Sequence, residues 1–275
     1  MSDKQSKISF ITTCKGRLEH LKETLPRLVS FEGFEVVVVD FDCPQGTRDF
    51  VRETYPQVTV VEVDNEPVFN ASKARNRGAE AATADRLFFV DADIVLAPGV
   101  LEMVEKVPTD HFGEFLFRND VRGTCVVPRQ AYDDVGGYDE VMQGYCGEDV
   151  DLYHRFELLG YNRHKLPDDG IERVIEHSDL DRITNYGTGR KVSFAKGKLY
   201  REVKSLLMRL EMRADISLEL RRQIWQRVDE MFRSEDVYKT GAFLDIPLPK
   251  IESPAFIDNC HFTRSLRFTA KVDLE

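Results

Sequence analysis

Two acidic residues, Asp91 and Asp93, follow an apolar run that begins at Arg86. The run is bulky and too short for a confident helix, which predicts a buried strand of a parallel sheet. In an open α/β sheet ligands bind beyond the carboxyl ends of the strands, so both carboxylates would meet a ligand there. Residues two apart in an extended segment point the same way, and paired hard oxygens suit Mg²⁺ or Mn²⁺. The alternative is a strand followed by an acidic turn.

A second acidic group, Glu148, Asp149 and Asp151, stands at the predicted start of a helix that runs from Gly147 to Leu159. Carboxylates in the first turn complement the helix dipole, so capping is one interpretation. In the second interpretation, one carboxylate is a general base that takes a proton from an attacking hydroxyl group. We expect the dipole to lower the pKa of that carboxylate, which leaves it ionised at neutral pH but weakly basic.

His177 and several basic residues are further candidates. His177 ends a predicted strand, 171–176, and a ligand from a separate strand end would complete an octahedral metal site beside the aspartates, although a lone histidine is more often structural. Arg75-Asn76-Arg77 is either a solvated basic helix face or a nucleotide contact. Later basic residues are either a lid over a pyrophosphate or a plain basic loop; they are Arg182, Arg190 and Lys191.

The elements that must position these residues alternate between strand and helix from residue 8 to residue 90. Predicted strands cover 8–12, 34–40, 58–63 and 86–90, and helices follow the first three, the third capped by Asn70. This alternation predicts a parallel sheet with right-handed connections. A helix opened by Pro98 and strands at 115–117, 124–127 and 171–176 are expected next. Three glycines mark loops with positive φ: Gly136, Gly137 and Gly144.

The pattern changes beyond about residue 190. Two amphipathic stripes, 192–210 and 216–231, predict an α-hairpin that docks on the sheet or on a partner. The last thirty residues, from Asp245, are expected to be loop. We therefore predict a domain at 1–190 and a C-terminal helical extension at 191–275.

Composition limits the class of protein. The chain has 275 residues, 42% of them hydrophobic and 10% aromatic, which suffices for a packed core. A net charge of −10 argues against a nucleic-acid partner. No signal peptide or transmembrane run is visible, and five scattered cysteines are typical of reduced thiols. We expect a cytoplasmic protein, with peripheral docking on a membrane or a protein through residues 191–235 as a further expectation.

Four segments in consistent order carry a family resemblance. They are Phe69-Asn-Ala-Ser-Lys-Ala-Arg-Asn-Arg-Gly78, Val90-Asp-Ala-Asp93, Gly136-Gly-Tyr-Asp-Glu140 and Gly144-Tyr-Cys-Gly-Glu-Asp-Val-Asp-Leu152. Together they resemble the inverting glycosyltransferases of the GT-A fold, most of all family 2 and the β-1,4-galactosyltransferase type. The resemblance covers residues 8 to about 180, and it implies a Rossmann-like, mostly parallel sheet flanked by helices.

The resemblance also implies residue roles. Asp149 would be the general base, and the acceptor would contact Glu148, Tyr145 and Gly147. Mn²⁺ or Mg²⁺ would be held by Asp93 and His177 together with Asp91, which also contacts the donor. The remaining nucleotide and donor contacts would be Thr13, Arg17, Asp40, Asp42, Arg75 and Asn76.

The implied reaction is a metal-dependent, inverting transfer of a hexose or N-acetylhexosamine from a UDP-sugar. The acceptor would be a sugar hydroxyl of a glycan or lipid-linked glycan, as in polysaccharide biosynthesis. The sequence departs from the family where Asp40-Phe-Asp-Cys-Pro-Gln-Gly-Thr47 replaces Asp-Asp-Gly-Ser-x-Asp-Gly-Thr, so either Asp40 or Asp42 reads the base. Tyr145-Cys146 replaces the usual Trp-Gly, which leaves sugar preference open.

Three alternatives remain at this stage. One is a retaining GT-A transferase of the polypeptide N-acetylgalactosaminyltransferase type, which usually has Asn where Asp149 stands. Another is a sugar nucleotidyltransferase, for which the basic loop from Thr13 to Arg17 is only a faint match. The third is a non-catalytic module that docks through its helical tail.

Overall fold

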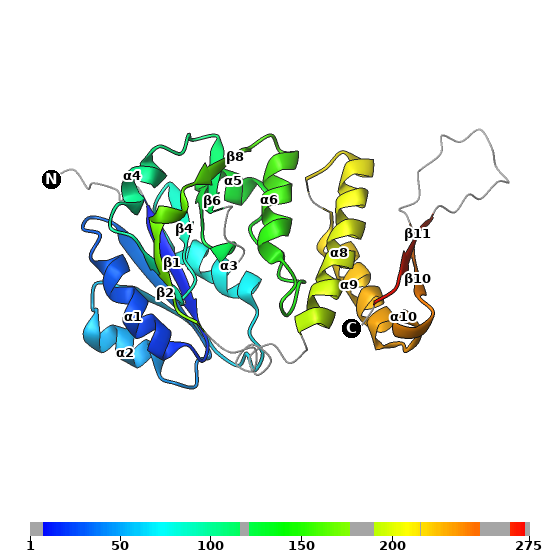
Figure 1. Cartoon of the computed structure of the whole chain (residues 1–275), viewed down its shortest axis with the longest axis horizontal. Helices are drawn as coiled ribbons and strands as arrows, with labels where there is room; N and C mark the ends of the chain where they lie inside the picture. The colour runs from blue at the N-terminus through cyan, green and yellow to red at the C-terminus, as the bar shows by residue number, and fades with distance from the viewer. Residues whose placement is uncertain (1–7, 116–120, 177–189, 215, 248–264, 273–275) are drawn as a thin grey trace.

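A seven-stranded sheet organises the chain in the computed structural model, which describes residues 8–115, 121–176, 190–214, 216–247 and 265–272 (Figure 1). The strand order is β3-β2-β1-β4-β7-β6-β8. β1, β2, β3 and β4 are parallel, while β7 runs antiparallel to both β4 and β6. The strands are β1 (Ser9–Cys14), β2 (Glu35–Phe41), β3 (Thr59–Val63), β4 (Arg86–Phe89), β6 (His111–Phe115), β7 (Cys125–Pro128) and β8 (Asn162–Leu166).

Helices cover both faces of this sheet. Beneath one face, leucines spaced three and four apart on α1 (Leu18–Val29) pack with α2 (Thr47–Thr54) and α4 (Val100–Glu105). Against the other face pack α3 (Ala71–Ala81), α5 (Arg129–Asp134) and α6 (Glu148–Leu158). β2 is buried along almost its whole length, as expected for a strand covered on both sides.

The predicted strand–helix alternation from β1 to β4 is confirmed, including the Asn70 cap, whose side chain accepts from the Lys73 N–H at 2.9 Å. Of the strand expected at 115–117, only Phe115 is described, and it is the last residue of β6; residues 116 and 117 lie outside the described residues. Three elements were not foreseen: β5 (Ile94–Leu96), α5 and β8. β5 pairs antiparallel with β9 (Ile171–Val174), outside the main sheet. The positive φ expected at the three loop glycines is confirmed.

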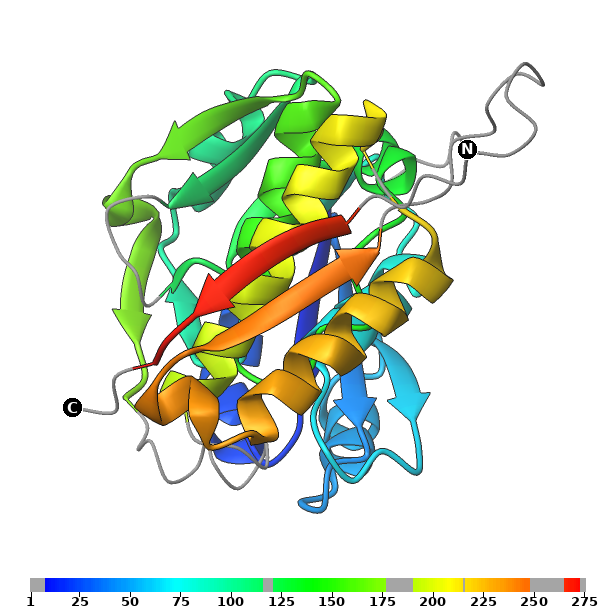
Figure 2. The same ribbon diagram turned by 90° about the vertical axis from the view of Figure 1, so that its right-hand side faces the viewer.

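The C-terminal extension contains more than the predicted hairpin. Its two long helices, α8 (Arg190–Glu211) and α9 (Leu218–Arg233), match the amphipathic stripes. The short α10 (Asp236–Lys239) leads into β10 (Ala242–Pro247), which pairs antiparallel with β11 (Ser265–Ala270). The expectation of loop beyond Asp245 was therefore wrong for both strands, which lie across α8 and α9 (Figure 2).

A buried charge cluster joins the extension to the sheet domain where α8 runs beside α6 (Figure 1). Lys204 of α8 is fully buried and donates to Asp139 at 2.7 Å and to Asp151 at 3.0 Å. Tyr200 and Arg221 also donate to Asp139, at 2.7 and 2.9 Å. These bonds fix the orientation of α8 against α6. Among the described helices, none is long and apolar enough to cross a bilayer.

Candidate active site

Arg75 links the two acidic segments singled out in the sequence. From α3 its Nη2 donates to Asp91 Oδ1 and its Nη1 to Glu148 Oε1, both at 2.7 Å. The Arg75 side chain is buried, and its guanidinium lies 5.2 Å from the ring centroid of Tyr138. The end of β4 and the start of α6, 57 residues apart along the chain from Asp91 to Glu148, are thus held at one place.

Gly123 makes this contact sterically feasible. A Cβ atom at that position would lie 2.5 Å from Arg75 Nη2 and 2.6 Å from Asp91 Oδ2. Real side chains do not approach so closely, so the backbone must carry glycine for Arg75 and Asp91 to meet there. The sequence analysis missed Gly123, because a single glycine in a loop has no distinguishing pattern.

Asp149 lies one residue beyond Glu148, in the first turn of α6, and its side chain is buried. Burial and the charge of Glu148 raise its pKa to about 6, against the opposing effects of the Val150 N–H and Arg75. The expectation that the helix dipole lowers this pKa was wrong, because loss of hydration outweighs the dipole at a buried carboxylate. Asp149 is consequently a stronger base than an exposed aspartate.

Asp151, two residues further along α6, belongs to a different environment. Its Oδ2 accepts from Arg155 at 2.9 Å and from Lys204 at 3.0 Å. Burial raises its pKa, but the charges of Lys204 and Arg155 outweigh burial and leave the pKa below its usual value. Asp151 is therefore a structural partner of α8 and does not face Arg75.

The loop after β2 holds the two candidates for reading the nucleotide base. Asp40 is fully buried, and its two oxygens accept the backbone N–H groups of Cys43 and Arg48, each at 2.8 Å. Asp42 has a positive φ of 50° and a side chain that is 42% exposed. The contacts of Asp40 therefore hold the loop at the start of α2, whereas Asp42 accepts the Glu66 N–H at 3.2 Å and stays partly exposed.

The other predicted donor contacts occupy two places. Thr13 and Arg17 lie at the end of β1 and just before α1, beside the loop that contains Asp42. Asn76 lies next to Arg75 but is occupied, because it donates to the Tyr138 carbonyl at 3.0 Å and to Glu140 at 2.8 Å. Asn76 thus fastens α3 to the segment that leads to α6, and we find no free polar group on it for a nucleotide.

The predicted metal ligands are described in part. Asp91 and Asp93 follow β4 in a turn closed by the Ile94 N–H, which donates to the Asp91 carbonyl at 3.0 Å, so the extended conformation expected there was wrong. His177 lies outside the described residues. Ile175 donates its N–H to the Asp93 carbonyl at 2.8 Å, so the chain described up to residue 176 passes Asp93. No group of three potential ligand side chains gathers within the described residues. Two carboxylates still fit Mg²⁺ or Mn²⁺, which commonly take one or two carboxylates together with substrate phosphates and water.

On the acceptor side, Tyr145 and Gly147 precede α6. Gly147 has a φ of +76° and forms the N-cap of the helix, and Tyr145 is half-buried. α8 packs closely on this loop, because a Cβ at Gly197 would lie 2.2 Å from the carbonyl oxygen of Cys146.

Lys204 was not predicted as a functional residue from the sequence, although a lysine on the apolar stripe of α8 was a signal for a buried charge.

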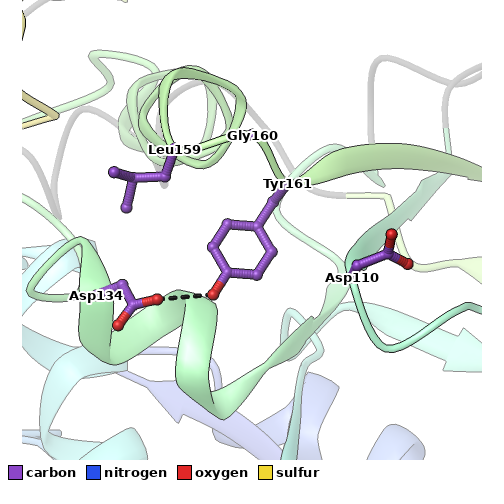
Figure 3. A pocket seen from close by; sticks show the side chains of 5 residues that line it. All are labelled: Asp110, Asp134, Leu159, Gly160 and Tyr161. Atoms are coloured by element: carbon purple, nitrogen blue, oxygen red, sulfur yellow. Dashed lines mark hydrogen bonds between the residues drawn. The ribbon is translucent and has the colours of Figure 1, made fainter.

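A shallow hollow elsewhere on the surface is lined by Asp110, Asp134 and the turn from Leu159 to Tyr161 (Figure 3). Tyr161 donates to Asp134 at 2.7 Å across it. The hollow adjoins the C-terminal end of α6, about 14 Å of helix away from Asp149. It takes no part in the arrangement around Arg75.

Comparisons with known proteins agree with this arrangement. The model of glycosyl transferase family 2 matches residues 9–138. The model described as the N-terminal domain of galactosyltransferase matches residues 115–181, the part that contains Tyr145, Glu148 and Asp149. No curated protein sequence matches the chain.

Solved structures share the fold at low sequence identity. A mannosyltransferase, PcManGT from Pyrobaculum calidifontis in complex with GDP-Man and Mn²⁺, aligns with a TM-score of 0.54 and 16% identity over 86% of this chain and 72% of its own. S. aureus TarS 1–349 aligns with a TM-score of 0.56 and 15% identity over 85% and 75%. Its complex with UDP gives 0.51 and 16% over 86% and 94%.

The fold is that of the GT-A enzymes, with a mostly parallel central sheet flanked by helices. The protein is a glycosyltransferase, and its residues 9–138 match the model of glycosyl transferase family 2.

Proposed function

We propose that the protein is an inverting, metal-dependent glycosyltransferase that moves a hexose or N-acetylhexosamine from a UDP-sugar to a hydroxyl of a glycan or lipid-linked glycan. The observation that carries this proposal is Asp149. It is buried at the start of α6 with a pKa raised to about 6, beside Glu148, which Arg75 connects to Asp91. A base next to a diphosphate-binding strand end is what a direct displacement requires.

Asp149 acts as the general base in this proposal. A base works best when its pKa lies near the working pH, because it is then ionised and still binds a proton well. At neutral pH Asp149 is mostly ionised, and it accepts the proton of the attacking hydroxyl. The hydroxyl oxygen forms the new bond at the anomeric carbon as the bond to the diphosphate breaks, so the configuration inverts.

The donor diphosphate is assigned to the end of β4. Asp91 and Asp93 would hold the metal ion, with His177 as a further ligand. Support comes from the antiparallel β5–β9 pairing, in which Ile94 opposes Val174. The Ile175–Asp93 hydrogen bond continues this register, so the described chain that leads towards His177 passes beside Asp93. When bound, the cation would neutralise the charge that develops on the departing diphosphate.

Arg75 and Glu148 orient the reactants. The single positive charge of Arg75 is shared between Asp91 and Glu148, and its two hydrogen bonds hold both carboxylates in place before substrates arrive. Pre-positioned charge avoids reorganisation during the reaction. Glu148 contacts the acceptor, and Tyr145 offers an aromatic face to a sugar ring.

Uracil is proposed as the base of the donor, with Asp42, Thr13 and Arg17 around it. UDP is the ligand of one similar structure, and GDP-Man of another. A glycan or lipid-linked glycan acceptor and a cytoplasmic location stay predictions from the sequence.

The proposal is tested with the full-length protein and a panel of UDP- and GDP-sugars, each with Mn²⁺, Mg²⁺ or EDTA. We expect a UDP-sugar with metal to raise the melting temperature, since a ligand selective for the native state stabilises it. We also expect metal-dependent hydrolysis whose first-formed sugar has inverted anomeric configuration by NMR.

Each of the following results would contradict a part of the proposal. A retained configuration identifies the retaining alternative, and pyrophosphate release identifies a nucleotidyltransferase. Response to GDP-sugars alone would make the uracil assignment wrong. No thermal shift and no turnover with any nucleotide would favour a non-catalytic module.

A further inference from the structure

Arg201 brings the C-terminal extension to the acceptor side of the site. It lies on α8 between Tyr200 and Lys204, both of which are anchored to the sheet domain through Asp139. A Cβ at Gly147 would lie 3.2 Å from Arg201 Nη2 and 3.4 Å from its Nε. The guanidinium therefore packs against the residue that immediately precedes Glu148 and Asp149.

Arg201 differs from the other cations at this contact, because it pairs with no carboxylate in the described part of the chain. Lys204, Arg155 and Arg221 each donate to Asp139 or Asp151. Among the residues that the structure describes, no carboxylate pairs with Arg201, and its Nε is buried without a hydrogen-bond partner. A buried donor left unsatisfied beside a substrate site is unusual, because such groups are nearly always bonded.

The chemistry of the Arg201 guanidinium indicates which kind of ligand could bind to it. A guanidinium presents parallel N–H donors that match the oxygens of a carboxylate or phosphate. The chain carries a net charge of −10, so an anionic ligand needs a placed cation to approach the acid-rich start of α6. The acceptor carboxylate Glu148 is already paired with Arg75, and no other carboxylate of the described residues forms a salt bridge with Arg201.

We propose that Arg201 forms an anion-binding subsite on the acceptor side, which recognises a phosphate or carboxylate group carried by the acceptor near its reacting hydroxyl. This inference rests on the proposed function, and it makes the extension the element that sets acceptor class. The donor diphosphate is assigned to Asp91 and Asp93, whereas Arg201 contacts Gly147 next to the acceptor carboxylate Glu148, so Arg201 is expected to serve the acceptor.

The test measures binding, so it does not depend on turnover. Glucose 6-phosphate, glucuronate and glucose are titrated into the full-length protein and followed by NMR, without UDP and with saturating UDP and Mn²⁺. We expect wild type to bind at least one anionic probe about tenfold or more tightly than glucose, in both conditions. Which probe shows the preference distinguishes a phosphate-bearing from a carboxylate-bearing acceptor.

Three variants test whether the preference for an anionic probe depends on Arg201. Arg201→Gln should abolish the preference, Arg201→Lys should keep part of it, and Arg209→Gln, an exposed arginine further along the same helix, should leave it unchanged. Equal binding of the three probes by wild type, or a preference that survives in Arg201→Gln, would overturn the inference. Displacement of the anionic probe by UDP would also overturn it, because the anion would then occupy the diphosphate site. Failure of UDP to bind at all would instead count against the proposed function.

Discussion

Two groups of acids flank the start of α6, and they differ in how their charge is balanced. Asp139 and Asp151 share three cations, Lys204, Arg155 and Arg221. Despite the opposing effect of burial, these cations hold the pKa of both carboxylates below the usual value. This cluster, which we call the anchor cluster, fixes α8 to the sheet domain.

The second group, which we call the reactive cluster, comprises Asp91, Glu148 and Asp149 with the single cation Arg75. Here the pKa of Asp149 is raised to about 6, since burial and a like charge are not compensated. The comparison teaches that burial alone does not assign a role to an acid. A carboxylate whose charge is matched by cations stabilises the fold, and one left without enough cations is suited to bind a metal ion or a proton.

The largest expected effect is that of Asp149→Asn. Loss of the base should lower kcat about 100- to 10,000-fold, while the melting temperature stays the same or rises, because a buried charge is removed. Transfer rate and thermal unfolding are measured together, with Asp133→Asn as an exposed control on α5. A near wild-type rate in Asp149→Asn would make the assignment of the base wrong.

Lys204→Met should break the anchor cluster and spare the reactive one. The substitution keeps the length of the side chain but leaves two buried carboxylates with one cation fewer, which we expect to lower the free energy of unfolding by roughly 3 kcal/mol. Urea denaturation measures this, and Lys198→Met, on the exposed side of α8, is the control. A loss no larger than that of the control would show that the cluster does not anchor the extension.

Gly123→Ala should disturb the reactive cluster from outside it. The added methyl would displace Arg75 or Asp91, and we expect about a tenfold loss of kcat/KM for the donor, since small misplacements of catalytic groups are costly. Gly99→Ala, where the added methyl meets open space, is the matched control. Equal kinetics in the two variants would mean that the Arg75–Asp91 contact is not used in the reaction.

Much of the fold followed from the sequence because the apolar runs of β1 to β4 alternate with helices whose apolar spacing is regular. β10 and β11 escaped prediction, since 17 residues separate the two strands of this pair.

The acidic residues were recognised in the sequence, but their separation into an anchor cluster and a reactive cluster was not predicted. Sequence spacing puts Asp149 and Asp151 in one helix turn, and only packing decides that Lys204 meets Asp151 while Asp149 stays uncompensated.

The site also depended on contacts that no local pattern encodes. Arg75 was identified as a basic residue near a nucleotide, yet its position between Asp91 and Glu148 requires close approach at Gly123. Asp40 was a candidate for base recognition, and its two backbone hydrogen bonds could not be read from its neighbours. Burial and long-range pairing set these roles.

Titration of the aspartate carboxyl carbons by ¹³C NMR in the metal-free protein tests the central contrast most directly. We predict one resonance with a midpoint near pH 6, absent in Asp149→Asn, while Asp139 and Asp151 stay ionised below their ordinary pKa. Because the pKa of Asp149 is higher in the folded state than in the unfolded state, its protonation stabilises the fold as the pH falls from about 6 to 4. Protonation of Asp139 and Asp151 at still lower pH breaks the anchor cluster and destabilises the fold. An Asp149 midpoint at or below 4, level with that of Asp151, would contradict the account.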